Sequence, residues 1–178
     1  MIFVPTPLPG VFVVEPERRE DERGFFARTF CAREFAERGL ESRVAQCSVS
    51  FNPRRATLRG LHYQAAPHAE AKLVRCTRGE IFDVAVDLRP DSPAFRRHLG
   101  LILSAEDRRM LYVPAGCAHG FETLTDDCEV FYQISEPHTP EAARGVRWDD
   151  PAFAIPWPLP PAVISERDRA YPDFEGGG

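Results

Sequence analysis

Three side chains that could act on an anionic molecule stand close together between Leu58 and Lys72. They are Arg59, His62 and Lys72 itself, and the residues around them are largely apolar and β-prone. Strands of this kind seldom bury several cations without a use for them. We interpret the segment as the floor of an anion-binding site that contains a base. On this stretch alone, a strand with a satisfied core histidine and two solvated cations is the favoured interpretation, so the rest of the chain has to decide.

The spacing of Arg59 and His62 raises a geometric question. In a regular strand, two residues an odd number apart point to opposite faces. Gly60 lies between them, and a glycine can host a β-bulge that turns both side chains to the same face. We therefore predict a bulge at Gly60, with Arg59 and His62 both facing inward.

A second histidine follows a tight-turn motif. Pro114, Gly116 and His119 have the spacing P-x-G-x-x-H, which resembles the second motif of jelly-roll cupins. Many cupins bind a metal through a first H-x-H pair, but the corresponding residues here are His62-Tyr63-Gln64. Two histidines without a close acidic ligand make a poor transition-metal site. We expect no metal, so that the histidines are free to move protons.

The elements that must position these residues are mostly strands. Short β-prone runs recur from residue 43 to residue 135, separated by turn signals and almost without helix between them. This pattern predicts an all-β, cupin-type jelly-roll barrel with short peripheral helices. The predicted strands are Gly10–Val14, Gly24–Phe30, Val44–Phe51, Thr57–Gln64, Lys72–Thr77, Ile81–Leu88, His98–Ser104, Met110–Val113, His119–Leu124 and Cys128–Ser135.

Outside the barrel we expect a charged loop at Glu15–Arg23, a short helix at Cys31–Arg38 and a proline-rich C-terminal arm. The arm should be anchored by Trp148 and Trp157. It should end in a helical turn, Ile164–Arg169, with Ser165 as its N-cap. We expect a single domain, 1–178, with a frayed tail at 173–178.

Composition limits the class of protein. The chain has 178 residues, a net charge of −5 and no run of basic residues, which argues against a nucleic-acid surface. Its 5 cysteines form no C-x-x-C pair, which fits a reducing compartment. We see no signal peptide and no stretch of membrane-spanning length. We expect a cytoplasmic protein with no membrane partner.

The motifs together resemble the dTDP-4-dehydrorhamnose 3,5-epimerase family, a metal-free branch of the cupins. The resemblance runs from about Gly10 to Pro172. Several matching segments in the right order make it specific. They are Asp21-Glu-Arg-Gly-Phe-Phe26, Leu58-Arg-Gly-Leu-His-Tyr-Gln64, Lys72-Leu-Val74, Gly79–Arg89, Pro114–Phe121, Trp148-Asp-Asp-Pro151 and Ile164–Asp168.

The resemblance implies an isomerase without a cofactor that acts on a nucleotide-linked 4-keto-6-deoxy sugar. It removes the protons at C3 and C5 through an enolate. His62 is implied as the base, with Asp168 orienting its imidazole. Tyr132 is implied as the acid on the opposite face, and Lys72 as the group that stabilises the enolate oxygen. The implied substrate-binding residues are Arg23, Phe26, Gln46, Ser48, Arg59, His119 and Asp83, with His119 paired to Asp83 and the two arginines at the diphosphate.

Taken singly, these residues have plainer interpretations. Tyr132 alone would be a strand aromatic with its hydroxyl at the rim, and Asp168 alone a solvated carboxylate in a charged stretch. Arg23 could decorate the surface. Cys47, Cys117 and Cys128 fit buried small hydrophobes better than nucleophiles. The joint match favours the functional interpretation.

The sequence departs from the family pattern near the ligand. Arg28 stands where Glu is usual, Cys47-Ser48 where Asp-Asn is usual, Gln133 where Lys is usual, and Ala143 where Glu is frequent. Such changes alter which nucleotide or sugar hydroxyl is accepted. The alternatives are therefore a C3-only epimerase, an epimerase of a CDP- or GDP-linked sugar, a cupin that binds a nucleotide sugar without turnover, and a metal-dependent cupin enzyme.

The resemblance also implies a homodimer. The N-terminal strand region of one subunit would complete the site of its neighbour. Such pairing would account for the aromatic segment Phe25–Phe30, which is too apolar for an exposed edge.

Overall fold

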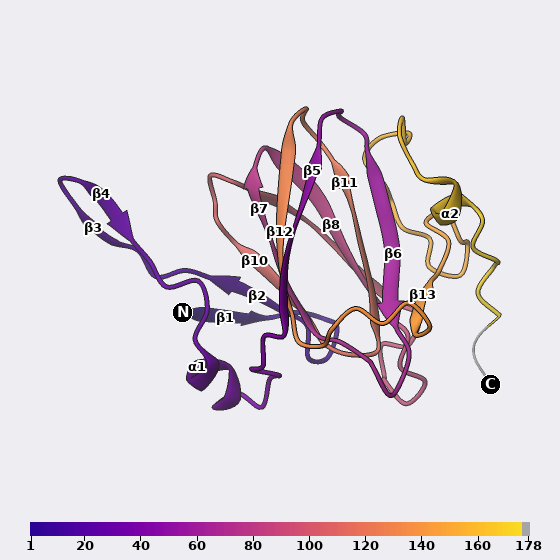
Figure 1. The fold of residues 1–178 in the computed structure, drawn as a ribbon, viewed down its shortest axis with the longest axis horizontal. Helices are drawn as coiled ribbons and strands as arrows, with labels where there is room; N and C mark the ends of the chain where they lie inside the picture. The colour runs from indigo at the N-terminus through magenta and orange to yellow at the C-terminus, as the bar shows by residue number, and fades with distance from the viewer. Residues whose placement is uncertain (176–178) are drawn as a thin grey trace.

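Two antiparallel sheets form the body of the protein in the computed structural model, which describes residues 1–175 (Figure 1). One sheet has six strands in the order β1-β2-β10-β7-β12-β5, and the other has five in the order β13-β6-β11-β8-β9. The six strands are β1 (Ile2–Pro5), β2 (Phe12–Glu15), β10 (Met110–Val113), β7 (Lys72–Arg78), β12 (Cys128–Ile134) and β5 (Gln46–Asn52). The five are β13 (Ala143–Gly145), β6 (Leu58–Gln64), β11 (Cys117–Thr123), β8 (Glu80–Asp87) and β9 (His98–Ser104).

The main core lies between the two sheets. Val74 and Val130 from the six-stranded sheet pack there with Ile81, Leu103 and Phe121 from the five-stranded sheet. Each of these side chains is at most 1% exposed. Side chains point alternately inward and outward along each strand, so the inward polar residues of both sheets face the space between the sheets. This two-sheet arrangement is the jelly roll that the strand pattern predicts.

The predicted strands from residue 43 to residue 135 are all confirmed, and each boundary agrees within two residues. Three elements escaped prediction. Strand β1 contains Pro5, which discourages a strand assignment, although β1 is an edge strand and tolerates proline there. The interpretation of 15–23 as a loop is wrong in part, because β3 (Arg19–Asp21) pairs with β4 (Gly24–Phe26). Strand β13 has only three residues and depends on pairing with β6.

The β3–β4 hairpin extends away from the barrel (Figure 1). Its ladder joins Arg19 to Phe26 and Asp21 to Gly24. The Phe26 side chain is left 76% exposed. The short helix α1 (Ala32–Ala36) follows and buries Phe35 against the β1–β2 side, where it contacts the rings of Phe3 and Tyr112. The hairpin is thus anchored at its base and free at its tip.

The C-terminal arm wraps the outside of the five-stranded sheet and ends beside β6 (Figure 1). The Trp157 indole N–H donates to the Trp148 carbonyl oxygen at 2.8 Å, as expected for two anchoring residues. The buried carboxylate of Glu122 accepts the Leu159 backbone N–H at 3.1 Å. Helix α2 (Glu166–Arg169) is capped by the Ser165 hydroxyl, as predicted. The arm therefore has fixed contacts up to α2.

Among residues 1–175, no helix is long and apolar enough to cross a membrane. The predicted fraying of the tail concerns 173–178, of which 176–178 lie outside the described residues.

Candidate active site

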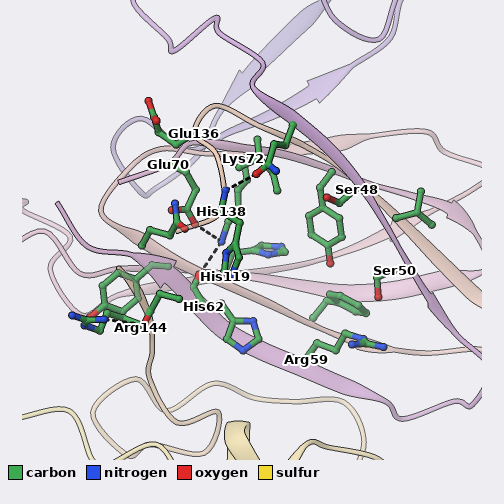
Figure 2. Close-up of a pocket in the computed structure, with 18 of the residues that line it drawn as sticks. Ser48, Ser50, Arg59, His62, Glu70, Lys72, His119, Glu136, His138 and Arg144 are labelled. Carbon is green, nitrogen blue, oxygen red and sulfur yellow. Dashed lines mark hydrogen bonds and ion pairs between the residues drawn. The ribbon is translucent and has the colours of Figure 1, made fainter. Parts of the chain in front are cut away.

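A cavity of about 350 Å³ opens between the two sheets, and residues from both of them line it (Figure 2). Strands β5, β7 and β12 supply one wall, and β6, β11 and β13 supply the other. The lining residues are Gln46, Ser48, Val49, Ser50, Arg59, His62, Tyr63, Gln64, Glu70, Lys72, His119, Phe121, Tyr132, Ile134, Glu136, His138, Ala143, Arg144 and Arg167.

The bulge predicted at Gly60 is confirmed. His62 pairs with His119 and Arg59 pairs with Phe121, so β6 has one residue more than β11 over this stretch. As a result, Arg59 and His62 both line the cavity. Gly60 has a φ of +130°, and a Cβ there would come within 2.6 Å of the Gly120 Cα, so no larger residue fits the bulge.

His62 forms a dyad with Asp168. The His62 Nε2 lies 2.7 Å from Asp168 Oδ1, and the Gly60 N–H donates to Asp168 Oδ2 at 3.2 Å. Burial alone would raise the pKa of Asp168, but the hydrogen bonds from His62 and Gly60 outweigh it and lower that pKa. A carboxylate fixed in this way holds the proton on Nε2 and leaves Nδ1 as the basic nitrogen. The His62 side chain is 42% exposed, so a ligand can reach it.

Tyr132 approaches the same space from the other sheet. It lies on β12 of the six-stranded sheet, whereas His62 lies on β6 of the five-stranded sheet, and both line the cavity. Burial, reinforced by the negative charge of Asp83, raises the pKa of Tyr132 despite the opposing effect of Arg59. Its hydroxyl therefore keeps its proton at neutral pH. An imidazole and a phenol hydroxyl group thus stand on opposite walls of the cavity.

Lys72 lies at the start of β7 and reaches across to the opposite sheet. Its Nζ donates to the His62 carbonyl oxygen at 3.0 Å and forms an ion pair with Glu70 Oε1 at 2.9 Å. Only 12% of the Lys72 side chain is exposed. Two acceptors therefore fix an ammonium at the backbone of His62 in the cavity wall, where it can stabilise negative charge on a bound molecule.

His119 forms a second histidine–aspartate dyad at the back of the cavity. Its Nε2 lies 2.8 Å from Asp83 Oδ1, as the resemblance implies, and both side chains are almost completely buried. The His119 ring contacts the Tyr132 ring edge to face, with centroids 6.0 Å apart. Asp83 does not line the cavity itself, so it acts through His119.

Arg59 is held at the other end of β6. Its Nε donates to Asn52 Oδ1 at 2.6 Å, and the fully buried Asn52 amide is itself tied to the Cys128 carbonyl oxygen. Among the lining residues, four are cationic and two are carboxylates. They are Arg59, Lys72, Arg144 and Arg167 against Glu70 and Glu136. This local excess of positive charge favours an anionic ligand in a chain of net charge −5.

The cavity contains most of the expected binding residues. Gln46, Ser48, Arg59 and His119 all line it. Arg23 and Phe26 do not, because they lie on the β3–β4 hairpin outside the barrel. The Arg23 side chain is 84% exposed and paired with Asp21 at 2.6 Å.

Several cavity residues were not predicted. Glu70, Ser50, Asn52, Glu136, His138, Arg144 and Arg167 line the cavity or hold a residue that does. The sequence did contain a signal for Glu70. It stands two residues before Lys72, a spacing that puts two side chains on the same face of an extended chain. The others come from segments whose contacts are not local in sequence.

The cysteines offer no nucleophile at the site. Cys117 and Cys128 are buried, as expected, and burial raises the pKa of Cys117 to about 12. The expectation of a buried Cys47 is wrong, because Cys47 lies exposed on the outward face of the edge strand β5. Across residues 1–175, no group of three or more histidine, cysteine or acidic side chains is arranged to hold a metal ion.

The fold defines a cupin-like jelly-roll protein, and two histidine–aspartate dyads meet at its cavity. Comparison with known proteins gives the family. Residues 5–176 match the family model described as dTDP-4-dehydrorhamnose 3,5-epimerase. The chain therefore belongs to the dTDP-4-dehydrorhamnose 3,5-epimerase family of isomerases.

Individual relatives agree over nearly full length. A curated dTDP-4-dehydrorhamnose 3,5-epimerase from Methanothermobacter thermautotrophicus is 47% identical over 172 residues, which are 95% of this chain and 92% of the relative. The crystal structure of a Bacillus anthracis dTDP-4-dehydrorhamnose 3,5-epimerase with TDP and PPi bound has a TM-score of 0.93 at 38% identity, covering 97% and 99% of the two chains. A 3′-monoepimerase from Streptomyces bikiniensis, in complex with dTDP-quinovose, has a TM-score of 0.87 at 34% identity, covering 95% and 86%.

Proposed function

We propose that this protein inverts C3 and C5 of a dTDP-linked 4-keto-6-deoxyhexose by proton transfer through an enolate. One observation carries the proposal: His62, paired with Asp168, and Tyr132 line one cavity from opposite sheets, and the Lys72 ammonium, bound to the His62 carbonyl oxygen, lines the same cavity. Inversion at carbon needs a base on one face and an acid on the other. The family relationship supports the choice of substrate.

The reaction assigns a role to each group. His62 Nδ1 takes the proton next to the C4 ketone, and Asp168 stabilises the imidazolium that forms. The electron pair moves to the C4 oxygen, where Lys72 stabilises the enolate. Tyr132 then returns a proton to the same carbon from the opposite face. Its pKa, raised by burial, matches a donor that must stay protonated until the enolate takes the proton.

The remaining residues would hold the substrate. Arg59 is positioned by Asn52 to meet a diphosphate oxygen, since a guanidinium suits the geometry of phosphate. His119, fixed by Asp83, faces the sugar. Gln46 and Ser48 line the β5 wall. Ser48 has a shorter side chain than the Asn usual in the family, which leaves more room there.

Product stereochemistry tests the reaction directly. Purified protein would be incubated with dTDP-4-keto-6-deoxyglucose, and the mixture reduced and analysed by proton NMR. Inversion at both C3 and C5 is the expected outcome. Inversion at C3 alone would place the chain with the 3′-monoepimerase that it resembles at 34% identity. No change of any kind, with tight binding of dTDP, would favour a binding protein and contradict the proposal.

We also propose that the protein acts as a homodimer in which the β3–β4 hairpin of one subunit reaches the cavity of the other. Three observations support this. The hairpin extends from the barrel (Figure 1), its Phe26 side chain is 76% exposed, and Val49 and Phe51 on the edge strand β5 are 58% and 48% exposed. Apolar surface of this kind is typical of an interface. Arg23 would then supply a second cation for the diphosphate.

A complementation experiment tests the exchange of hairpins. Arg23→Ala and His62→Asn each impair the sites of their own homodimers. In a co-expressed heterodimer, one of the two sites combines an intact His62 with an intact Arg23 from its neighbour. The heterodimer should recover about half of the wild-type rate. A heterodimer no more active than the mean of the two parent variants would contradict the arrangement.

The state of the cysteines bears on the cellular compartment. All five cysteines are free, including the exposed Cys47. Exposed and buried free thiols together fit a reducing environment. We propose that the protein works in the cytoplasm.

A further inference from the structure

Glu70 is a buried carboxylate in the wall of the cavity that the proton transfers do not use. It lies two residues before Lys72, just ahead of β7, and the two side chains meet in an ion pair. Only 5% of its side chain is exposed, and it lines the cavity. Figure 2 shows Glu70 beside Lys72 on the same side of the cavity. A buried carboxylate is normally hydrogen-bonded or paired with a cation through both of its oxygens.

The two oxygens of Glu70 differ. Oε1 is 2.9 Å from the Lys72 Nζ. Oε2 is buried and has no hydrogen-bond partner among the described residues. A buried acceptor without a donor is unfavourable, and a hydroxyl group from a bound molecule would satisfy it. The free protein therefore contains an acceptor that a ligand can complete.

We propose that Glu70 Oε2 accepts a hydrogen bond from the C3 hydroxyl of the substrate hexose. The assignment rests on the proposed function, which places Lys72 at the C4 oxygen. The two carbons next to C4 are C3, which carries a hydroxyl, and C5, which carries the methyl carbon and the ring oxygen. Only C3 offers a donor next to the oxygen that Lys72 holds, and Glu70 is the carboxylate bound to that lysine.

This contact has two consequences for the reaction. Glu70 would orient Lys72 through one oxygen and the sugar through the other, so that the C3–H bond keeps a fixed direction relative to His62. It would also select against sugars that lack the C3 hydroxyl, because those sugars leave Oε2 unpaired in the complex. Glu70 is thus a substrate-binding and specificity-determining residue.

The test compares two substrates in heavy water: dTDP-4-keto-6-deoxyglucose and its analogue without the C3 hydroxyl, dTDP-4-keto-3,6-dideoxyglucose. Deuterium wash-in at C5 reports kcat/KM for both, since C5 is common to them. Wild type should prefer the hydroxylated sugar by about 10- to 100-fold. Glu70→Met has a similar volume but no acceptor, and its preference should fall below about 3-fold. A disturbance of Lys72 would slow C5 exchange of both substrates alike, so it would not change the ratio of their kcat/KM values.

Two further variants serve as controls for the role of the Glu70 carboxylate. Glu70→Gln keeps one acceptor oxygen and should show an intermediate preference. Glu106→Gln makes the same chemical change at an exposed carboxylate after β9 and should match wild type. A Glu70→Met protein that exchanges C5 but keeps the wild-type preference would overturn the role of Glu70 alone. A wild-type protein that exchanges neither substrate would overturn the proposed function and the Glu70 contact with it.

Discussion

Two histidine–aspartate dyads meet the same cavity, and their hydrogen-bond lengths are almost equal. His62 and Asp168 are 2.7 Å apart, and His119 and Asp83 are 2.8 Å apart. Their surroundings differ sharply. The His62 side chain is 42% exposed, whereas that of His119 is 4% exposed. The two dyads therefore differ in their access to ligand and solvent and not in the length of their hydrogen bonds.

The carboxylates of the two dyads, Asp168 and Asp83, also differ in how fully they are hydrogen-bonded. Asp168 uses both oxygens, one for His62 and one for the Gly60 N–H, and its pKa lies below the ordinary value. Asp83 uses one oxygen, while its Oδ2 is buried without a hydrogen-bond partner among residues 1–175. The first dyad is open enough for His62 to take a proton from a bound molecule. The second is enclosed, although His119 still lines the cavity next to Tyr132.

Removing the acid on the opposite wall should have the largest effect. Tyr132→Phe keeps the ring contact with His119 but removes the proton donor, so inversion should slow by about 10²- to 10⁴-fold. His62 still removes a proton and returns one to the same face. Deuterium should therefore enter the unconverted substrate without inversion, as proton NMR in heavy water can show. Loss of exchange and inversion in equal measure would contradict the placement of acid and base on separate walls.

Asp168→Asn should have the next largest effect on rate. An amide can donate to His62 Nε2 and so favour the wrong tautomer, which slows kcat by about 10²-fold. The KM should change little, since Asp168 does not line the cavity. Steady-state kinetics with the dTDP-linked substrate would show the split. A rise in KM at constant kcat would mean that Asp168 binds substrate instead of orienting the base.

For the stability of the fold, the His119–Asp83 dyad should matter more than the His62–Asp168 dyad. Asp83→Ala leaves the buried His119 nitrogen without its acceptor and should lower the free energy of unfolding by about 3 kcal/mol. Asp168→Ala leaves the half-exposed His62 to water and the Gly60 N–H without its acceptor, and it should cost less, about 1–2 kcal/mol. Urea denaturation of both variants against wild type measures the difference. A larger loss for Asp168→Ala would contradict the division into a working dyad and a structural one.

The smallest expected effect is a pH dependence of stability from Asp168. Its pKa is lower in the folded chain than in the unfolded chain, so the folded state binds this proton more weakly. The stability that Asp168 contributes is complete above the unfolded value of about 3.8 and is lost as the pH falls through the lower folded value. The difference in Tm between wild type and Asp168→Asn should therefore shrink in that acid range. A difference that grows toward low pH would have the wrong sign.

The local features of the site could be predicted from the sequence. The Gly60 bulge follows from an odd spacing with a glycine inside it, and the Ser165 cap follows from its position before a short polar helix. These features depend on residues a few positions apart. For the same reason, repeated strands and turns were enough to predict the jelly roll.

The non-local features could not be derived in this way. Asp168 reaches His62 because the arm packs against β6, with Thr57 bridged to Val163, and only the family resemblance pointed to it. Asn52 reaches Arg59 across the turn between two strands. The exposure of Cys47 depends on β5 being an edge strand, which the order of strands in the chain does not reveal.

The most direct test of the central claim compares the two histidines. His62→Asn and His119→Asn would each be incubated with dTDP-4-keto-6-deoxyglucose in heavy water, and deuterium at C3 and C5 followed by proton NMR. If His62 is the base, its variant should lose exchange at both carbons by at least about 10³-fold, whereas the His119 variant should retain exchange at a reduced rate. Equal losses in the two variants, or a greater loss for His119→Asn, would contradict the claim that the more exposed histidine, His62, is the base.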